Sequence, residues 1–226
     1  VQQVLENSIQ KLGYQDIKIY GSGRTDAGVH ALGQVAHFDL ADDCSYKLHR
    51  LRESINHFIQ PHSIKLLDLQ IVNHDFHARF DAVKRSYIYK IIYRSTEPIF
   101  WRNRAWHIRN DLEIGRMQEA SQLLVGYHDF ASFRSSNCQA KNSYRTLDSI
   151  EITQQQDQYA KLIEIKLTAR SFLHNQVRII VGSLHEIGRG NWDIDRISKA
   201  LLSKNRSLTG LTAPPFGLYL NSIDYN

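Results

Sequence analysis

Residues 85–93 read Arg-Ser-Tyr-Ile-Tyr-Lys-Ile-Ile-Tyr. Side chains alternate between the two faces of a β-strand, so a strand here would be apolar on both faces. One face would carry Tyr87, Tyr89, Ile91 and Tyr93, and the other Ile88 and Ile92. A strand that is apolar on both faces is typical of the interior of a sheet. We therefore predict that this segment is a central strand.

From this strand onward the hydrophobic pattern predicts the order β-α-β-β-α-β, with one additional helix. The predicted elements are a helix carrying Ile114, Met117 and Leu124, strands near 146–153 and 160–168, a helix from Leu173 to Ile187 closed by Gly188, a short helix over 194–201 and a last strand from about Gly217. Asn110 and Glu113 have the spacing of a capping box ahead of the first of these helices.

The first part of the chain predicts the same order without its opening strand. It has a helix face within residues 1–12, strands at 17–19 and 34–39, a helix over 48–59 and a strand near 64–71. The repeat predicts an α+β fold of two ferredoxin-like βαββαβ halves, residues 1–83 and 84–226, which share one mostly antiparallel sheet flanked by helices. We also expect a strand before Val1 in the full protein.

Composition restricts the classes of protein to consider. The chain has 226 residues, 42% of them hydrophobic, and no apolar run approaches the roughly 20 residues that span a bilayer. The net charge of +5 suits a polyanionic partner but does not establish one. Cys44 and Cys138 are too far apart for a Cys-x-x-Cys pair, and reduced thiols are favoured over a disulfide. We expect a cytoplasmic location.

Residues 21–31, Gly-Ser-Gly-Arg-Thr-Asp-Ala-Gly-Val-His-Ala, lie between two predicted strands. Their glycines allow tight turns and a close approach of the backbone to a ligand. Arg24 and Asp26 would present a cation and a carboxylate to that ligand. From spacing alone, a glycine-rich turn with a solvated ion pair explains the segment at least as well. A phosphate-binding loop is less favoured, because its lysine is absent and a strand, not a helix, is predicted to follow.

The stretch Gly-Arg-Thr-Asp-Ala-Gly-Val-His-Ala, residues 23–31, resembles the signature of the TruA family of tRNA pseudouridine synthases. Further segments that resemble the family are 77–80, 85–89, 129–133, 172–184 and 217–220. The resemblance implies the pseudouridine synthase fold, with the catalytic cleft between the halves. Family members usually begin with a strand and a Tyr-Asp-Gly motif, and this sequence shows neither.

The resemblance also implies a function and its residues. Uridines in the anticodon stem-loop, at positions 38–40 of the tRNA, would be isomerised to pseudouridine by a homodimer that needs no cofactor and no metal. Asp26, Tyr87 and Arg178 would be catalytic, and Tyr87 would contact the target uracil. The implied substrate-binding residues are Arg24, Arg79 and Leu218 as well as Tyr87. Arg24 would fill the space of the flipped base or hold the adjacent phosphate, so Arg24→Ala should impair catalysis more than tRNA binding.

Physical chemistry gives these roles a rationale. Asp26 must be ionised to attack a carbon or to stabilise positive charge, and burial alone would favour its protonated form. A nearby arginine opposes that effect, and Arg178 lies among apolar residues, which argues for burial with a partner rather than for a solvated helix charge. His174, four residues earlier, would share its helix face. Without the resemblance, Tyr87 could not be chosen over Tyr89.

Two other functions remain open from the sequence. One is an RNA-binding protein that has lost activity, against which the intact Arg24-Thr25-Asp26 segment argues. The other is a carboxylate-dependent RNA glycosidase or nuclease, which would need a second carboxylate; Asp129 is the nearest candidate, although it more readily orders its own loop. An arginine-rich stretch around Trp101 and Trp106 is as easily a nucleic-acid surface as a solvated loop. The histidines expected to be structural are His30, His37 and His107.

Overall fold

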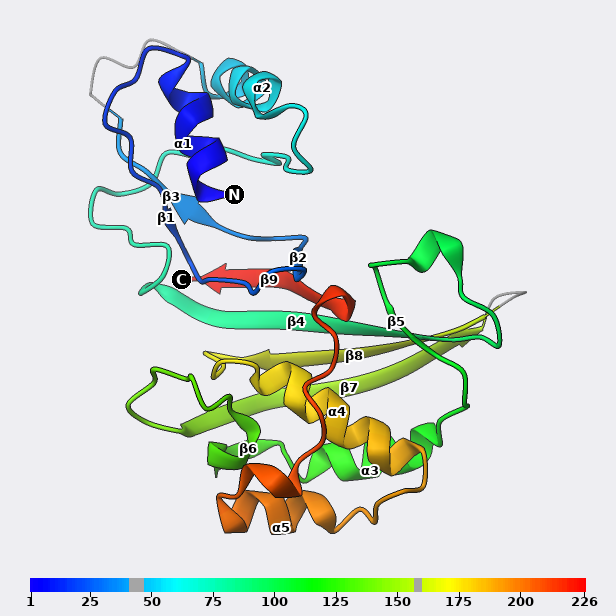
Figure 1. Cartoon of the computed structure of the whole chain (residues 1–226). Coiled ribbons are helices and arrows are strands. Elements are labelled where there is room, and N and C mark those ends of the chain that lie inside the picture. Colours follow the sequence, from blue (N-terminus) through cyan, green and yellow to red (C-terminus); the bar gives the residue numbers. More distant parts are fainter. Residues whose placement is uncertain (41–46, 157–159) are drawn as a thin grey trace. The chain divides into compact units, whose positions relative to one another are not determined.

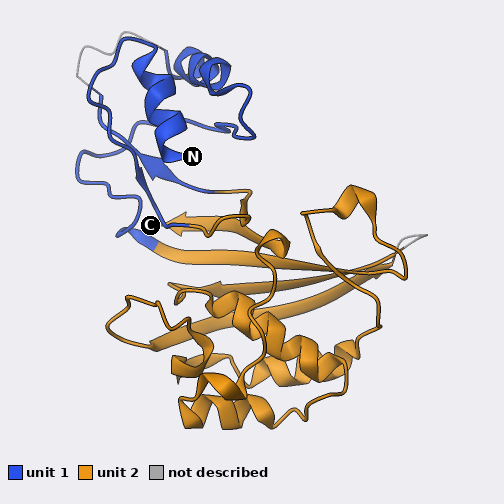
Figure 2. Ribbon diagram, in the orientation of Figure 1, with its two compact units in different colours: residues 1–24, 34–82 blue, residues 25–33, 83–226 orange. Residues whose placement is uncertain are grey.

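A computed structural model describes residues 1–40, 47–156 and 160–226 as a mixture of helices and strands (Figure 1). The chain forms two compact units. The first comprises Val1–Arg24 and Gln34–Ala82, and the second comprises Thr25–Gly33 and Val83–Asn226 (Figure 2). Residues 25–33, which include Asp26, thus belong to the second unit. The division into ferredoxin-like halves at residue 83 stays a prediction.

Within the described residues, a seven-stranded, mostly antiparallel sheet has the order β2-β9-β4-β8-β7-β6, with β5 paired to β4. The strands are β2 (His30–Ala31), β4 (Ala82–Tyr93), β5 (Trp106–Ile108), β6 (Gly126–Asp129), β7 (Tyr144–Gln156), β8 (Lys161–Ala169) and β9 (Leu218–Tyr225). Two pairs, β2 with β9 and β4 with β5, are parallel. This α+β architecture confirms the predicted fold class.

Strand β4 lies in the interior of this sheet, which confirms the prediction from residues 85–93. It pairs with β8 from Arg85↔Ala169 to Tyr93↔Lys161 and neighbours β9 on its other side. Tyr89 and Ile91 are fully buried on one face, and Ile92 is buried on the other. The two apolar faces of this strand are both used in packing.

Helices α3 (Ile114–Gln122) and α4 (Gln176–Gly188) pack on the sheet and enclose the main core. Leu184 and Ile180 of α4 are fully buried together with Ile163 and Ile165 of β8. The two helices are in close contact at Gly188, where a Cβ would lie 2.6 Å from Met117 Sδ. The second unit is completed by α5 (Arg196–Ser203) and by short 3-10 helices at Ile99–Trp101, Ala131–Phe133, Arg206–Leu208 and Pro215–Gly217.

The first unit has a smaller core of its own. Helices α1 (Gln2–Gln10) and α2 (Leu48–Ile59) bury Ile9, Leu51 and Ile55 against one another. Strands β1 (Tyr20–Gly21) and β3 (Ala36–His37) form a separate two-stranded antiparallel sheet and do not join the larger one. The predicted strand at 17–19 is wrong, because β1 begins only at Tyr20, and the predicted strand at 34–39 is shortened to Ala36–His37.

The predicted strand at 64–71 is wrong, because this segment is irregular. Ile64, Leu66 and Leu69 do pack against the first core, which accounts for the apolar alternation. However, the backbone of Leu66 is bound by a side chain instead of a strand: Asn56 Nδ2 donates to Leu66 O at 2.8 Å, and Leu66 N donates to Asn56 Oδ1 at 2.8 Å. The alternating apolar pattern at 64–71 therefore reflects the packing of these side chains against the first core, and no strand pairing accompanies it.

The N-terminal ends of two helices also differ from the predicted ones. Helix α3 has Glu113 as its N-cap with no side-chain capping bond, so the capping box of Asn110 and Glu113 does not form. Helix α4 begins at Gln176, and Leu173 precedes it. Of the cysteines, Cys138 is free and half-buried, and Cys44 lies outside the described residues. In the described part of the chain, no helix has the length and apolarity to cross a membrane.

Candidate active site

Asp26 lies in a turn that is fixed to the second unit. Its carbonyl accepts a hydrogen bond from Val29 N at 3.1 Å, and the chain then enters β2, where His30 is paired with Tyr219. Gly28 closes the turn with φ +83°, and a Cβ there would lie 3.2 Å from Pro215 Cγ. A glycine is required at this position by both the backbone angle and the close neighbour.

Arg178, in the first turn of α4, holds the carboxylate of Asp26. Its Nη1 donates to Asp26 Oδ2 at 3.1 Å and to Asn175 Oδ1 at 2.8 Å, and its Nε donates to Ala213 O at 2.6 Å. The Arg178 side chain is 14% exposed, whereas that of Asp26 is 35% exposed. One side of the carboxylate therefore faces solvent.

His174 is a second partner of Asp26. Its Nε2 lies 3.3 Å from Asp26 Oδ1, so each carboxylate oxygen has its own neighbour. The sequence placed His174 and Arg178 on one helix face, but α4 begins only at Gln176. The two side chains meet at Asp26 because the chain turns at Asn175, which has a left-handed φ of +62°. A regular helical spacing could not have revealed this contact.

The N-terminal end of α4 adds a favourable field to these contacts. The first backbone N–H groups of a helix have no partner within the helix and carry partial positive charge. Asp26 contacts residues 174 and 178, which flank that end. The guanidinium of Arg178 and the imidazole of His174 thus hold the carboxylate beside this end of the helix.

The segment 209–214 runs along α4 and supports Arg178. Ala213 N donates to Arg178 O at 3.1 Å, and Gly210 N donates to Ser183 Oγ at 2.8 Å. A Cβ at Gly182 would lie 1.9 Å from Leu211 O, so the segment is in direct backbone contact with the helix. We call residues 209–214 the strap.

Tyr87 and Tyr89, which the sequence could not distinguish, have different environments. Tyr89 is fully buried, and its hydroxyl donates to Pro214 O of the strap at 2.8 Å. Tyr87 is half-buried, with Phe172 packed edge-on against its ring at a centroid distance of 5.2 Å. Burial raises the pKa of the Tyr87 hydroxyl, Arg85 lowers it and the charge of Asp26 raises it. Tyr87 is therefore a neutral hydrogen-bond donor near Asp26.

The remaining candidate residues are spread over both units. Leu218 is buried in the main core at the start of β9. Arg24 and Arg79 are exposed side chains of the first unit. Asp129 orders its own loop, as expected, because its carboxylate accepts from Ser143 Oγ and Ala131 N and pairs with Lys204. His30, His37 and His107 all make the structural contacts expected of them.

A family model described as tRNA pseudouridine synthase matches residues 1–81 and 120–226. The chain belongs to the tRNA pseudouridine synthase family. The matched ranges contain Asp26, His174 and Arg178, whereas Tyr87 lies between them. Among tRNA pseudouridine synthases of type A, the chain is 47% identical to that of Ehrlichia chaffeensis, 46% to that of Parvibaculum lavamentivorans and 44% to that of Wolbachia pipientis. Each alignment covers 100% of this chain and 89% of the relative.

In a member of the tRNA pseudouridine synthase family, the exposure of these two side chains bears on how a substrate could reach Asp26. The half-exposed carboxylate is reachable from solvent, while the arginine that holds it is nearly covered. Such an arrangement can present a charged oxygen to a substrate and keep its cationic support away from water.

Proposed function

We propose that this chain isomerises uridine to pseudouridine in tRNA, with Asp26 as the catalytic carboxylate. The observation that carries the proposal is the contact of Arg178 with Asp26 in a member of the tRNA pseudouridine synthase family. The relatives named tRNA pseudouridine synthase A align over the whole of this chain.

The reaction makes clear why an ionised carboxylate is useful. The bond between ribose C1′ and uracil N1 breaks, the base turns, and a bond forms between C1′ and C5. The proton of C5 is lost and N1 gains one, so the atoms balance without oxidation or reduction. Asp26 can attack C1′, attack the pyrimidine ring or assist removal of a ribose proton, and each role requires its charged form.

Arg178 holds Asp26 in a fixed position. An ion pair to a nearly covered guanidinium restricts the rotation of the carboxylate. The bonds of Arg178 to Asn175 and Ala213 leave the guanidinium little freedom to follow the substrate. A preorganised charge of this kind costs no rearrangement during the reaction.

Tyr87 contacts the uracil in this proposal. Its ring offers a stacking surface, and its neutral hydroxyl can donate a hydrogen bond. Arg24, Arg79 and Leu218 complete the substrate-binding set that the resemblance implies. The target base must leave its stack to reach Asp26, which costs a few kcal/mol. Action on the anticodon stem-loop, a homodimer and a cytoplasmic location are likewise proposed from the resemblance.

The test is a tritium-release assay with an unmodified tRNA transcript labelled at uridine C5. The proposed isomerase releases tritium, leaves the RNA chain intact and frees no uracil. Cleaved RNA would instead indicate a nuclease, and free uracil a glycosidase. Tight tRNA binding without any tritium release would indicate an RNA-binding protein and contradict the proposal.

A further inference from the structure

Two tyrosines at the edge of the main sheet are stacked and exposed. Tyr127 of β6 and Tyr144 of β7 have ring centroids 5.4 Å apart and an angle of 23° between their planes. Tyr127 is 68% exposed and Tyr144 is 41% exposed, so neither ring serves the core. Strand β6 is the last strand in the order of this sheet. A free aromatic face therefore points to solvent at this edge.

Two cationic residues lie near Tyr144. Lys204 pairs with Asp129 at 3.0 Å, and Asp129 is directly opposite Tyr144 in the strand register. Arg145 Nη1 donates to Tyr144 O at 2.6 Å. The charge of Asp129 is thus matched by Lys204, and Arg145 adds a positive charge. We call Tyr127, Tyr144, Arg145 and Lys204 the tyrosine platform.

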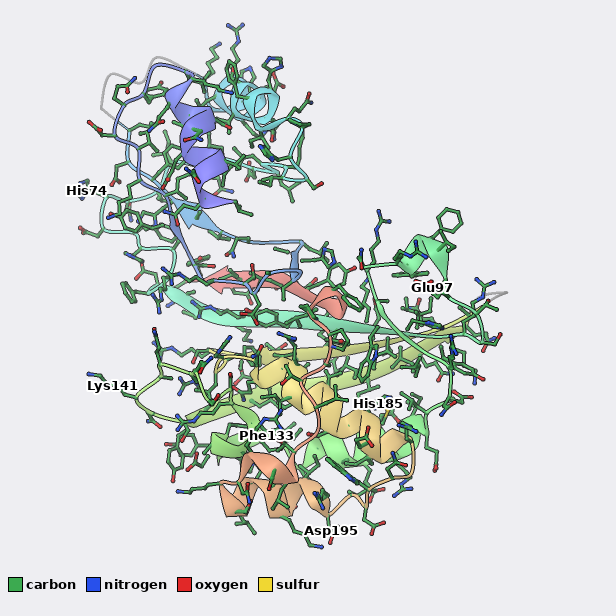
Figure 3. All side chains as sticks on the ribbon, in the orientation of Figure 1. His74, Glu97, Phe133, Lys141, His185 and Asp195 are labelled. Carbon is green, nitrogen blue, oxygen red and sulfur yellow. The ribbon has the colours of Figure 1, made fainter. Side chains whose placement is uncertain are left out.

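One loop connects the tyrosine platform to the active site within the second unit. At its start, Ser135 N donates to the carbonyl of His174 at 3.0 Å. The loop carries Lys141, whose side chain points away from the ribbon in Figure 3. It ends at Tyr144, where β7 begins. A substrate that reaches Asp26 would therefore find cationic and aromatic side chains along this loop.

We propose that the tyrosine platform is a second contact for the RNA substrate, at which one base stacks on Tyr127 while Lys141 and Arg145 neutralise neighbouring phosphates. Aromatic side chains stack on any base, and cations track the backbone, which together give sequence-tolerant binding. The inference rests on the proposed function, because it takes tRNA as the substrate.

The charge of the platform favours RNA over a second copy of the chain. An exposed edge strand can pair with another chain. Pairing of this edge with its own copy would bring together two platforms that each carry an excess positive charge, since Lys204 is matched by Asp129 and Arg145 is not, and like charges oppose such contacts. A polyanion meets the same cations favourably.

The experiment compares the wild-type protein with the Tyr127→Leu/Tyr144→Leu double variant. Leucine keeps an apolar side chain but removes the ring face. The dissociation constant for tRNA should rise about tenfold, as expected for loss of one stacked base. KM should rise by the same factor, while the single-turnover rate at saturating enzyme changes little. Leu123→Ala is the control, because Leu123 is an apolar side chain of the same unit that is 38% exposed, and its tRNA affinity should stay unchanged.

A second measurement addresses the phosphates. Lys141→Gln should reduce the slope of log affinity against log salt concentration by about the amount that corresponds to loss of one phosphate contact. Tyr127→Leu alone, a change at a side chain that is mostly exposed, serves if the double variant does not fold. An unchanged tRNA affinity in the tyrosine variants would overturn the inference. So would a change in self-association, measured by sedimentation, without a change in tRNA affinity. Failure of the proposed function is seen separately, as absence of tritium release by the wild-type protein.

Discussion

At the scale of single residues, the site depends on two side chains that each contact one oxygen of the same carboxylate. Arg178 contacts Oδ2 of Asp26, and His174 contacts Oδ1. His174 is 42% exposed and can move with a substrate, whereas Arg178 is fixed by Ala213 and Asn175. In our interpretation, Arg178 sets the position of Asp26, and the side toward His174 is where a substrate approaches.

If Arg178 fixes the position of Asp26, a positive charge alone at position 178 is not sufficient for full activity. In Arg178→Lys the ammonium cannot reproduce the planar fork that reaches Asp26, Asn175 and Ala213 together. We expect the single-turnover rate to fall about ten- to a hundredfold, which is the size expected for loss of one charged hydrogen bond. Arg189→Lys, at the exposed C-terminal end of the same helix, is the control and should retain the rate. A wild-type rate in Arg178→Lys would contradict the fixing role of the guanidinium.

These residues could be predicted from the sequence to different degrees. Arg178 lies among apolar neighbours, and such a setting predicts a covered cation with a partner, as the structure shows. Tyr87 and Tyr89 have the same strand face and chemistry, so only the three-dimensional contacts separate them. The contact of His174 arises from the left-handed residue Asn175, which no periodic pattern indicates.

At the scale of elements, α4 and the strap act as one support. Glycines at 182 and 210 allow the two backbones to touch: a Cβ at Gly210 would lie 2.4 Å from the carbonyl carbon of Gly182. This contact carries the strap to Ala213, whose carbonyl accepts the bond from Arg178 Nε. The position of Arg178 thus depends on residues that lie outside the site.

Two glycine substitutions separate this contact from ordinary helix propensity. In Gly182→Ala the new methyl group would overlap Leu211 O, and no flexible side chain can yield there. We expect a lower midpoint of thermal unfolding and a reduced rate of tritium release. In Gly115→Ala on α3 the methyl group meets nothing within 4 Å, so this helix should gain up to about 1 kcal/mol. A Gly182→Ala protein as stable and active as wild type would rule out the support role.

Elements with long, regular patterns could be predicted from the sequence. Strand β4 and helix α2 were expected within a few residues of their observed bounds. Strands β2, β5 and β6 are two to four residues long, too short to show a period. The irregular segment 64–71 shows the opposite failure, since its apolar alternation arises from packing against α2 and a side-chain bond from Asn56.

At the scale of the whole molecule, the two units differ in how much regular pairing they contain. Strand β4 pairs with β8 over nine register positions, whereas β1 and β3 pair over two. Local opening requires less free energy where fewer hydrogen bonds and buried contacts are broken. The first unit should therefore open more readily than the sheet of the second.

Hydrogen exchange measured by mass spectrometry tests this difference. Amides in peptides from β4 and β8 should exchange more slowly than those in peptides that contain Tyr20–Gly21 and Ala36–His37. The expected cause is the length of the ladder and the burial of both faces of β4. Equal protection in the two units would show that the first unit is stabilised by contacts that this account omits.

Composition gave the least information at this scale. A net charge of +5 is compatible with RNA binding but did not locate a surface for it. The grouping of Arg145 and Lys204 near Tyr144 depends on strand pairing and on α5, which bring together residues about 60 apart in sequence. Charge clusters of this kind become visible only in the folded chain.

The most direct test of the account is the single-turnover rate of Asp26→Asn with saturating tRNA. The amide keeps the size of the side chain but has no negative charge to offer the reacting base or sugar. We predict that tritium release falls about a thousandfold or more while the affinity for tRNA is largely retained. Release near the wild-type rate would contradict the assignment of Asp26 as the catalytic carboxylate.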